Sequence, residues 1–156
     1  MTSETPTAVG TIVGTDLTVD NAGEVCDFYA AVVGWEVETM AVDDHEDYVI
    51  KSPDGDWVAG VCHRTGPNAD LPPQWLVYVA VADLEQSLAH CAKLGGAAIT
   101  PIKGLGEGTP CAVVRDPAGA VLALSGPTPK EPQPSGCRLV GLRSCSAALP
   151  DVGRRL

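Results

Sequence analysis

The chain has 156 residues and a formal net charge of −10, which favours one domain, or two small modules sharing a core, and argues against a nucleic-acid partner. No apolar run approaches the roughly 20 residues that a membrane span needs, and the first ten residues show no basic region followed by an apolar one. We therefore expect a cytoplasmic protein without a membrane partner, whose six cysteines are reduced thiols rather than a disulfide framework.

The first half of the chain predicts one strand, one helix and three further strands. Alternating β-branched residues over 11–19 predict a strand, and apolar residues at helical spacing over 22–33 predict a helix that Gly34 ends. The three further strands are expected over 35–42, 47–52 and 56–63.

The second half predicts the same elements in the same order. A strand is expected over 75–81 and a helix over 84–94, which Gly95 and Gly96 end. The remaining strands are expected over 97–102, 110–116 and 120–125. An internal repeat of this length is one supersecondary unit used twice.

The repeat predicts an α+β fold of two βαβββ modules, residues 10–66 and 74–126, within one domain over 10–126. Residues 1–9 are expected to be loose, and 127–156 to form a Pro-rich linker and a disordered tail. A lone module leaves one face of its sheet bare, so we expect the two sheets to put their bare faces together around a shared cleft.

Four segments carry a resemblance to a known family. They are DFYAAVVGWEV, AHCAKLGGAAI, SPDGDWVAGV and DPAGAVLALSG, two helix ends and two Pro-x-Gly turns at matching places in the modules. Over about residues 10–126 the chain resembles the vicinal oxygen chelate superfamily of glyoxalases, bleomycin resistance proteins and extradiol dioxygenases. The resemblance implies a small-molecule ligand and a homodimer, either contiguous or domain-swapped.

Enzymes of this superfamily bind a divalent metal through His, Glu or Gln at four positions. The resemblance carries those positions onto Gly14, Ala59, Leu76 and Ala123. None of these side chains can coordinate a metal, and a shift of one residue along each strand does not supply a ligand. We therefore expect no metal and no cofactor.

Strand alternation predicts which residues line the cleft. The faces that carry Asp16 and Tyr78 are assigned to the cleft, because the valine-rich opposite faces suit packing under a helix. A desolvated Asp16 would have a raised pKa and could act as a general base, with Tyr78 as acid or oxyanion donor. The residues expected to bind the ligand are Trp57, Trp75, His63, Tyr48 and Leu76.

Strand alternation also bears on the faces of the other candidate residues. The same alternation places Trp57, Ala59, Val61 and His63 together on the cleft. Trp75 has the opposite parity from Tyr78 and is expected at the strand entrance, whereas the facing of Tyr48 is open.

Four functions remain open from the sequence. The first is a metal-independent protein that binds an aromatic small molecule, such as an antibiotic or another natural product. The second is a metal-independent lyase or isomerase that uses Asp16 and Tyr78. The third is a metal-dependent lyase or dioxygenase with Asp16 and His63 as ligands. The fourth is an interaction module whose cleft is filled by its own tail.

Overall fold

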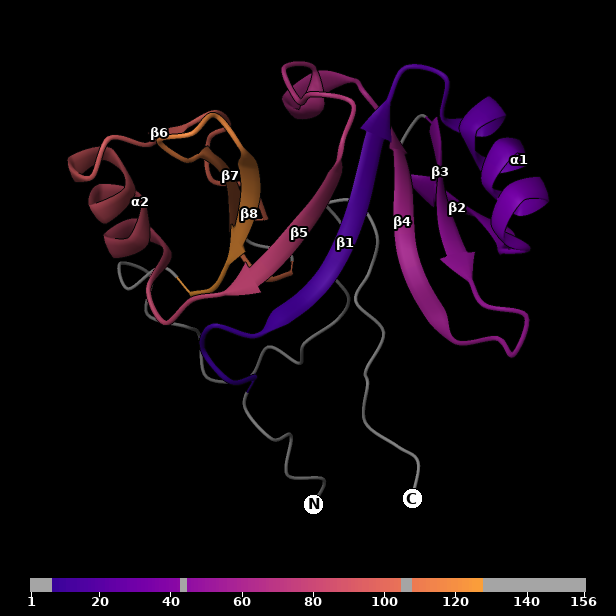
Figure 1. The fold of residues 1–156 in the computed structure, drawn as a ribbon, viewed down its shortest axis with the longest axis horizontal. Coiled ribbons are helices and arrows are strands. Elements are labelled where there is room, and N and C mark those ends of the chain that lie inside the picture. Colours follow the sequence, from indigo (N-terminus) through magenta and orange to yellow (C-terminus); the bar gives the residue numbers. More distant parts are fainter. Residues whose placement is uncertain (1–6, 43–44, 105–107, 128–156) are drawn as a thin grey trace.

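The computed structural model describes residues 7–42, 45–104 and 108–127, and its elements follow the predicted order (Figure 1). The first module consists of β1 (Ile12–Val19), α1 (Ala22–Val33), β2 (Glu36–Val42), β3 (His45–Lys51) and β4 (Trp57–His63). The second consists of β5 (Trp75–Ala80), α2 (Leu84–Lys93), β6 (Ala97–Ala98), β7 (Cys111–Arg115) and β8 (Val121–Ser125). A 3-10 turn, η1 (Gly66–Asn68), lies between them. The predicted α+β fold of two βαβββ modules is confirmed.

The strands of the described residues form one mixed sheet in the order β2-β3-β4-β1-β5-β8-β7-β6. In each module the first strand pairs in parallel with the last, β1 with β4 and β5 with β8. The two modules meet where β1 pairs with β5 in antiparallel fashion. The bare faces were expected to lie against each other; instead the modules join edge to edge, and their bare faces form one continuous surface.

The two helices lie at opposite ends of the sheet, on its outer side (Figure 1). Ala22 and Cys26 of α1 are buried against Leu17, Val19 and Val61 of the sheet. We call this side of the sheet the helix-covered face. The opposite side, which carries Asp16, Gly60 and Leu76 in one register row, is the helix-free face. Neither helix in the described residues is long and apolar enough to span a membrane.

The two Pro-x-Gly turns close equivalent hairpins, as predicted. Gly55 and Gly119 have φ angles of +87° and +92°, a region that glycine enters without steric cost. The amide of Gly55 donates to the carbonyl of Ser52, and that of Gly119 donates to the carbonyl of Asp116. These turns start β4 and β8 at matching places in the two modules.

The last strand of module one contains a β-bulge that its counterpart lacks. Lys51 pairs with Trp57, but the next pair is Ile50 with Ala59, so Val58 is an extra residue in β4. In the second module Arg115 pairs with Val121 and Val114 with Leu122, without an insertion. After the bulge, each residue of β4 therefore faces the opposite way from the one predicted by matching the turns.

Two smaller predictions were wrong. The strand expected over 97–102 ends after Ala98, because the hydroxyl oxygen of Thr100 accepts from the amide of Val113 and Pro101 has no amide to donate. Cys111 is disulfide-bonded rather than reduced, whereas Cys26 and Cys91 are free thiols. Disulfide pairing depends on which segments approach each other in space, which cysteine spacing does not show. Of the linker and tail predicted over 127–156, all but residue 127 lies outside the described residues.

Candidate functional site on the helix-free face

Asp16 lies in the middle of β1 and faces away from the helices. It pairs with Gly60 of β4 on one side and with Leu76 of β5 on the other. Its side chain is 3% exposed, and Leu76 is 0% exposed. Burying a carboxyl group among apolar residues costs free energy unless the group is neutral or well partnered. Asp16 is therefore the most conspicuous polar group on this surface.

Tyr78 donates a hydrogen bond to the Asp16 carboxyl group, and the backbone of Gly60 forms another. Tyr78 pairs with Gly14 of β1 and with Ala123 of β8, so it shares the helix-free face with Asp16. The sequence prediction that these two residues share a face is confirmed.

Burial raises the pKa of Asp16 well above its ordinary value of 3.8, and the nearby Asp47 carboxylate raises it further, while the hydrogen bonds from Tyr78 and Gly60 oppose the rise. Burial also raises the pKa of the Tyr78 hydroxyl well above 10.0, with the neighbouring Asp16 as a second cause. Both groups therefore favour their neutral forms. A neutral Asp16 can donate a hydrogen bond, and an ionised one can only accept.

Three buried side-chain atoms of the described residues have no hydrogen-bond partner, and all belong to β1 and β4. They are Oδ2 of Asp16, Nε1 of Trp57 and Nδ1 of His63. Nδ1 of His63 lies 3.6 Å from Oδ1 of Asp47, so this nitrogen has a polar neighbour although it forms no hydrogen bond. Buried polar atoms almost always find a partner, so each exception calls for an explanation such as a water, an ion or a ligand.

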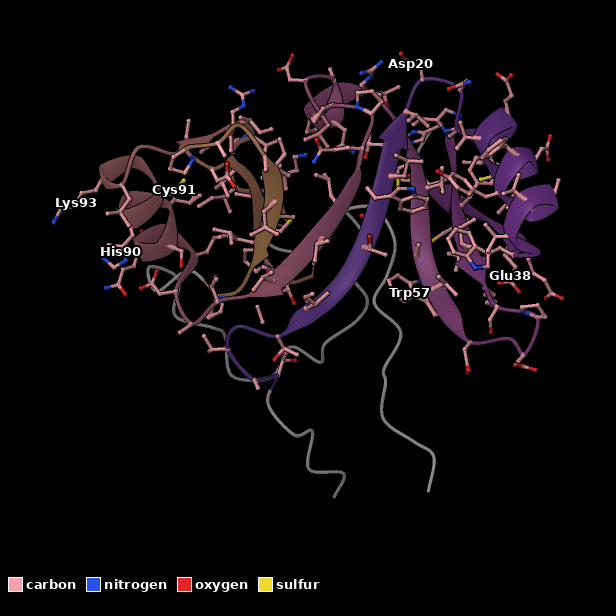
Figure 2. All side chains as sticks on the ribbon, viewed as in Figure 1. Asp20, Glu38, Trp57, His90, Cys91 and Lys93 are labelled. Atoms are coloured by element: carbon pink, nitrogen blue, oxygen red, sulfur yellow. The ribbon has the colours of Figure 1, made fainter. Side chains whose placement is uncertain are left out.

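Trp57 is the first residue of β4 and lies on the helix-free face. Trp57 pairs with Lys51, and Val49 pairs with Gly60. Lys51 and Val49 are two residues apart on β3, so their side chains point to the same side of the sheet. Antiparallel partners point to the same side of a sheet. Figure 2 shows Trp57 near the start of β4, beside β1. The predicted facing of Trp57 is therefore confirmed, because Trp57 precedes the bulge.

The predicted facing of Ala59, Val61 and His63 was wrong. Val61 pairs with Leu17 and His63 with Val19, and both partners belong to the core under α1. The extra residue at Val58 turns this part of β4 over. A bulge of this kind leaves no signal in the turn sequences, so matching the two Pro-x-Gly motifs could not find it.

Two other candidates also lie on the helix-covered face. Nε1 of Trp75 donates to the hydroxyl of Tyr29 at 3.0 Å, within an aromatic cluster that includes Trp35. The hydroxyl of Tyr48 lies against α1, where a Cβ built on Gly23 would stand 3.1 Å from it. These side chains pack between the sheet and α1, so they are not near Asp16, and the opposite parity predicted for Trp75 and Tyr78 is confirmed.

Sequence reasoning missed Asp47. Asp47 is 4% exposed and lies two residues from Val49 on β3, on the side of Gly60 and Asp16. Its Oδ1 accepts from the backbone amide of His63 at 2.9 Å. In the sequence Asp47 belongs to the acidic run VDDHED, which is typical of a solvated loop. Only the pairing of β3 with β4 shows that one of these acids is buried beside Asp16.

The residues on this face do not fit the metal site of the superfamily. The four ligand positions are occupied by Gly14, Leu76 and Ala123 and, because of the bulge, by Gly60 in place of Ala59. Within the described ranges no group of three or more His, Cys, Asp or Glu side chains could hold a metal ion. His63, the second ligand of the metal-dependent alternative, lies on the opposite face from Asp16, so we do not pursue that alternative.

A sequence model of the family described as a glyoxalase-like domain matches residues 13–125. The chain therefore belongs to the glyoxalase-like family, within the vicinal oxygen chelate superfamily.

Two relatives illustrate this membership. The chain is 32% identical over 123 residues to "Putative glyoxylase CFP32" of Mycobacterium bovis, which covers 78% of this chain and 46% of that protein. It is 34% identical over 122 residues to the anthracycline biosynthesis protein DnrV of Streptomyces peucetius, covering 70% of this chain and 44% of that protein. The chain thus spans less than half the length of these relatives.

The fold is also similar to that of hypothetical protein BH1468 from Bacillus halodurans. The TM-score is 0.51 at 9% identity, with 80% of this chain and 99% of that chain covered. At this level of identity the likeness shows the fold alone.

Proposed function

We propose that this protein binds an aromatic small molecule on its helix-free face without a metal ion. The observation that carries the proposal is the pair of buried, unpartnered polar atoms on that face, Oδ2 of Asp16 and Nε1 of Trp57. The register neighbours of the carboxyl group are small or apolar, with Gly60 and Leu76 beside it and Gly14 two residues away on the same face. Such a surface suits a flat apolar ligand that carries a few polar groups.

Two further observations support an aromatic, metal-independent ligand site. Glycine, leucine and alanine at the ligand positions offer no donor to a divalent cation. The relative DnrV has anthracycline biosynthesis in its name, and an anthracycline is a fused-ring aromatic compound. We also propose that the protein is cytoplasmic and acts as a homodimer.

Metal content and aromatic binding together test this function. The protein is incubated with Mn, Fe, Co, Ni and Zn, dialysed and measured by elemental analysis, and aromatic compounds are then titrated against it with binding followed by NMR. We expect no stoichiometric metal and saturable binding that shifts the resonances of Gly14 and Gly60. One metal per chain, or aromatic binding that requires added metal, would show the proposal to be wrong.

A second candidate function is proton transfer by Asp16, as in a metal-independent lyase or isomerase. The hydrogen bond from Tyr78 to Asp16 favours it, because it holds the carboxyl group in place and opposes the rise in its pKa. Ionised Asp16 would take a proton from the carbon next to a ligand carbonyl, leaving the electron pair of the C–H bond in an enolate. Tyr78 would act as a positioning residue, since its proton is directed at Asp16.

Deuterium exchange separates binding from proton transfer. A bound methyl ketone in D2O should exchange its methyl protons faster with the wild-type protein than with Asp16→Asn, as followed by proton NMR. If Asp16→Asn catalyses exchange as fast as the wild type, or if neither accelerates it, the proton-transfer candidate is wrong and binding alone remains.

A further inference from the structure

The two unpartnered atoms on the helix-free face differ in what they can bind. Nε1 of Trp57 is an indole N–H, which can only donate a hydrogen bond. Oδ2 of Asp16 belongs to a carboxyl group, which accepts when it is ionised and donates when it is neutral. A partner for Trp57 must therefore be an acceptor, whereas a partner for Asp16 in both states must be a group that donates and accepts. A carbonyl oxygen can accept from Trp57, and a hydroxyl group can both donate to and accept from Asp16.

The positions of Asp16 and Trp57 on the sheet bear on the size of the ligand. Trp57 is three residues from Gly60 along β4, and Gly60 is the register partner of Asp16. Three residues of strand correspond to roughly 10 Å, somewhat less across a bulge. Two fused aromatic rings with an oxygen at each end match this separation of the two backbone positions. The glycine at position 60 leaves the strand between the two atoms without a side chain.

The other polar partners of the site are already engaged. Oδ1 of Asp47 accepts from the backbone amide of His63, and the Tyr78 hydroxyl donates to Asp16. Lys51, beside Trp57, forms an ion pair with Glu38 at 2.7 Å. These contacts leave the indole N–H and the second carboxyl oxygen as the groups that a ligand would satisfy.

We infer that the ligand is a fused-ring aromatic hydroxy ketone, whose carbonyl oxygen accepts from Nε1 of Trp57 and whose hydroxyl pairs with Oδ2 of Asp16. The inference rests on the proposed function, since it names the ligand class of the same face. Stacking against an aromatic ligand would use only the faces of the Trp57 ring and would leave its N–H without a partner. The inferred ligand gives that N–H a hydrogen-bond acceptor.

Four probes that share one naphthalene ring system and differ in their acetyl and hydroxyl substituents test the inference. They are 6-hydroxy-2-acetonaphthone, which has a ketone and a hydroxyl at opposite ends of the ring system, 2-acetonaphthone, 2-naphthol and naphthalene. Dissociation constants are measured by fluorescence or NMR titration for the wild type, Trp57→Phe and Asp16→Leu. Trp35→Phe is the matched control for Trp57, because Trp35 lies in the aromatic cluster on the helix-covered face. Circular dichroism and thermal unfolding confirm that each variant is folded.

The hydroxy ketone should bind most tightly, and each missing oxygen should weaken binding several-fold. Trp57→Phe should weaken the two ketones by about tenfold, the effect of one hydrogen bond, and should leave 2-naphthol and naphthalene nearly unchanged. Asp16→Leu, which has no hydrogen-bonding group, should weaken 6-hydroxy-2-acetonaphthone and 2-naphthol and spare 2-acetonaphthone. Trp35→Phe should change none of the four constants.

The two possible failures are distinguishable. If all four probes bind with similar affinity, and neither variant discriminates among them, the hydroxy-ketone inference is wrong while aromatic binding on this face survives. If none of the probes binds, both the inference and the aromatic-binding proposal are wrong. If Trp57→Phe weakens naphthalene as much as the ketones, Trp57 acts through its ring and not through Nε1, which also overturns the inference.

Discussion

Tyr78 of β5 donates a hydrogen bond to the carboxyl group of Asp16 on β1, across the junction of the two modules. Each residue occupies the same place in its own module, so the contact joins the two copies of the repeat at one point. Because Asp16 is 3% exposed, the bond lies out of solvent, where a hydrogen bond is electrostatically stronger than in water. The pair therefore connects the two modules and also lies on the helix-free face.

Removing the Tyr78 hydroxyl should raise the pKa of Asp16. The Tyr78→Phe variant keeps the ring but loses the hydrogen bond that stabilises the ionised carboxyl group. An NMR titration of the Asp16 carboxyl carbon should show a higher midpoint than in the wild type. Tyr29→Phe, which removes a hydroxyl from the helix-covered face, should leave the midpoint unchanged, and an unaltered midpoint in Tyr78→Phe would contradict the pairing.

Replacing Asp16 by Asn should change how stability depends on pH. The folded chain holds the Asp16 proton more tightly than the unfolded chain, since burial raises the pKa from 3.8. As pH rises above 3.8, the unfolded chain loses this proton first, so the free energy of unfolding falls until the pH passes the raised folded-state pKa. Asp16→Asn lacks this loss and should gain stability relative to the wild type as pH rises through that window.

Urea unfolding of both proteins over a series of pH values measures this difference. The two curves should lie closest at the acidic end and separate toward neutral pH. Asp54→Asn, in the turn before β4, controls for the loss of one negative charge. A difference between wild type and Asp16→Asn that is constant with pH would mean that Asp16 has an ordinary pKa.

Deleting Val58 should destabilise the first module. Without the extra residue, either the face of Ala59 and Val61 turns away from α1 or the strand must slip against β3. Both side chains are 0% exposed in the core, so the loss should be about 2–5 kcal/mol, as for large cavities. Val58→Ala keeps the length of the strand and should cost only about 1 kcal/mol. Equal losses in chemical denaturation would show that the bulge does not set the register.

Replacing Trp75 by Phe should affect stability and not ligand binding. The change removes the 3.0 Å hydrogen bond from Nε1 to the Tyr29 hydroxyl, which should cost about 1 kcal/mol. A double-mutant cycle with Tyr29→Phe should recover most of that value as coupling between the two residues. Weaker binding of the naphthalene probes by Trp75→Phe would place Trp75 in the ligand site, contrary to its position under α1.

The repeated elements of this fold could be read from the chain itself. Strand alternation, the helix over 22–33 and the turns at Gly55 and Gly119 depend on local backbone preferences and on the spacing of apolar residues. Those are properties of neighbouring residues, so they are visible without a structure. The same holds for the donor-free side chains at Gly14 and Ala123, where residue type alone argues against metal coordination.

The faces of β4 could not be read in this way. A bulge depends on how a strand pairs with its neighbour, and Val58 looks like any other strand residue until β3 is placed beside it. One extra residue moved Val61 and His63 to the helix-covered face but left Trp57 on the face of Asp16. The burial of Asp47 likewise follows from the pairing of β3 and β4.

The sequence by itself thus determined the family, the two βαβββ modules and the chemical character of Asp16, Tyr78 and Trp57. The tertiary structure decided that the modules join edge to edge, that Tyr78 bonds to Asp16, and which aromatic residues share their face. The physical reason is that element type arises from contacts a few residues apart, whereas a site is made by strands whose register is set by hydrogen bonds between distant segments.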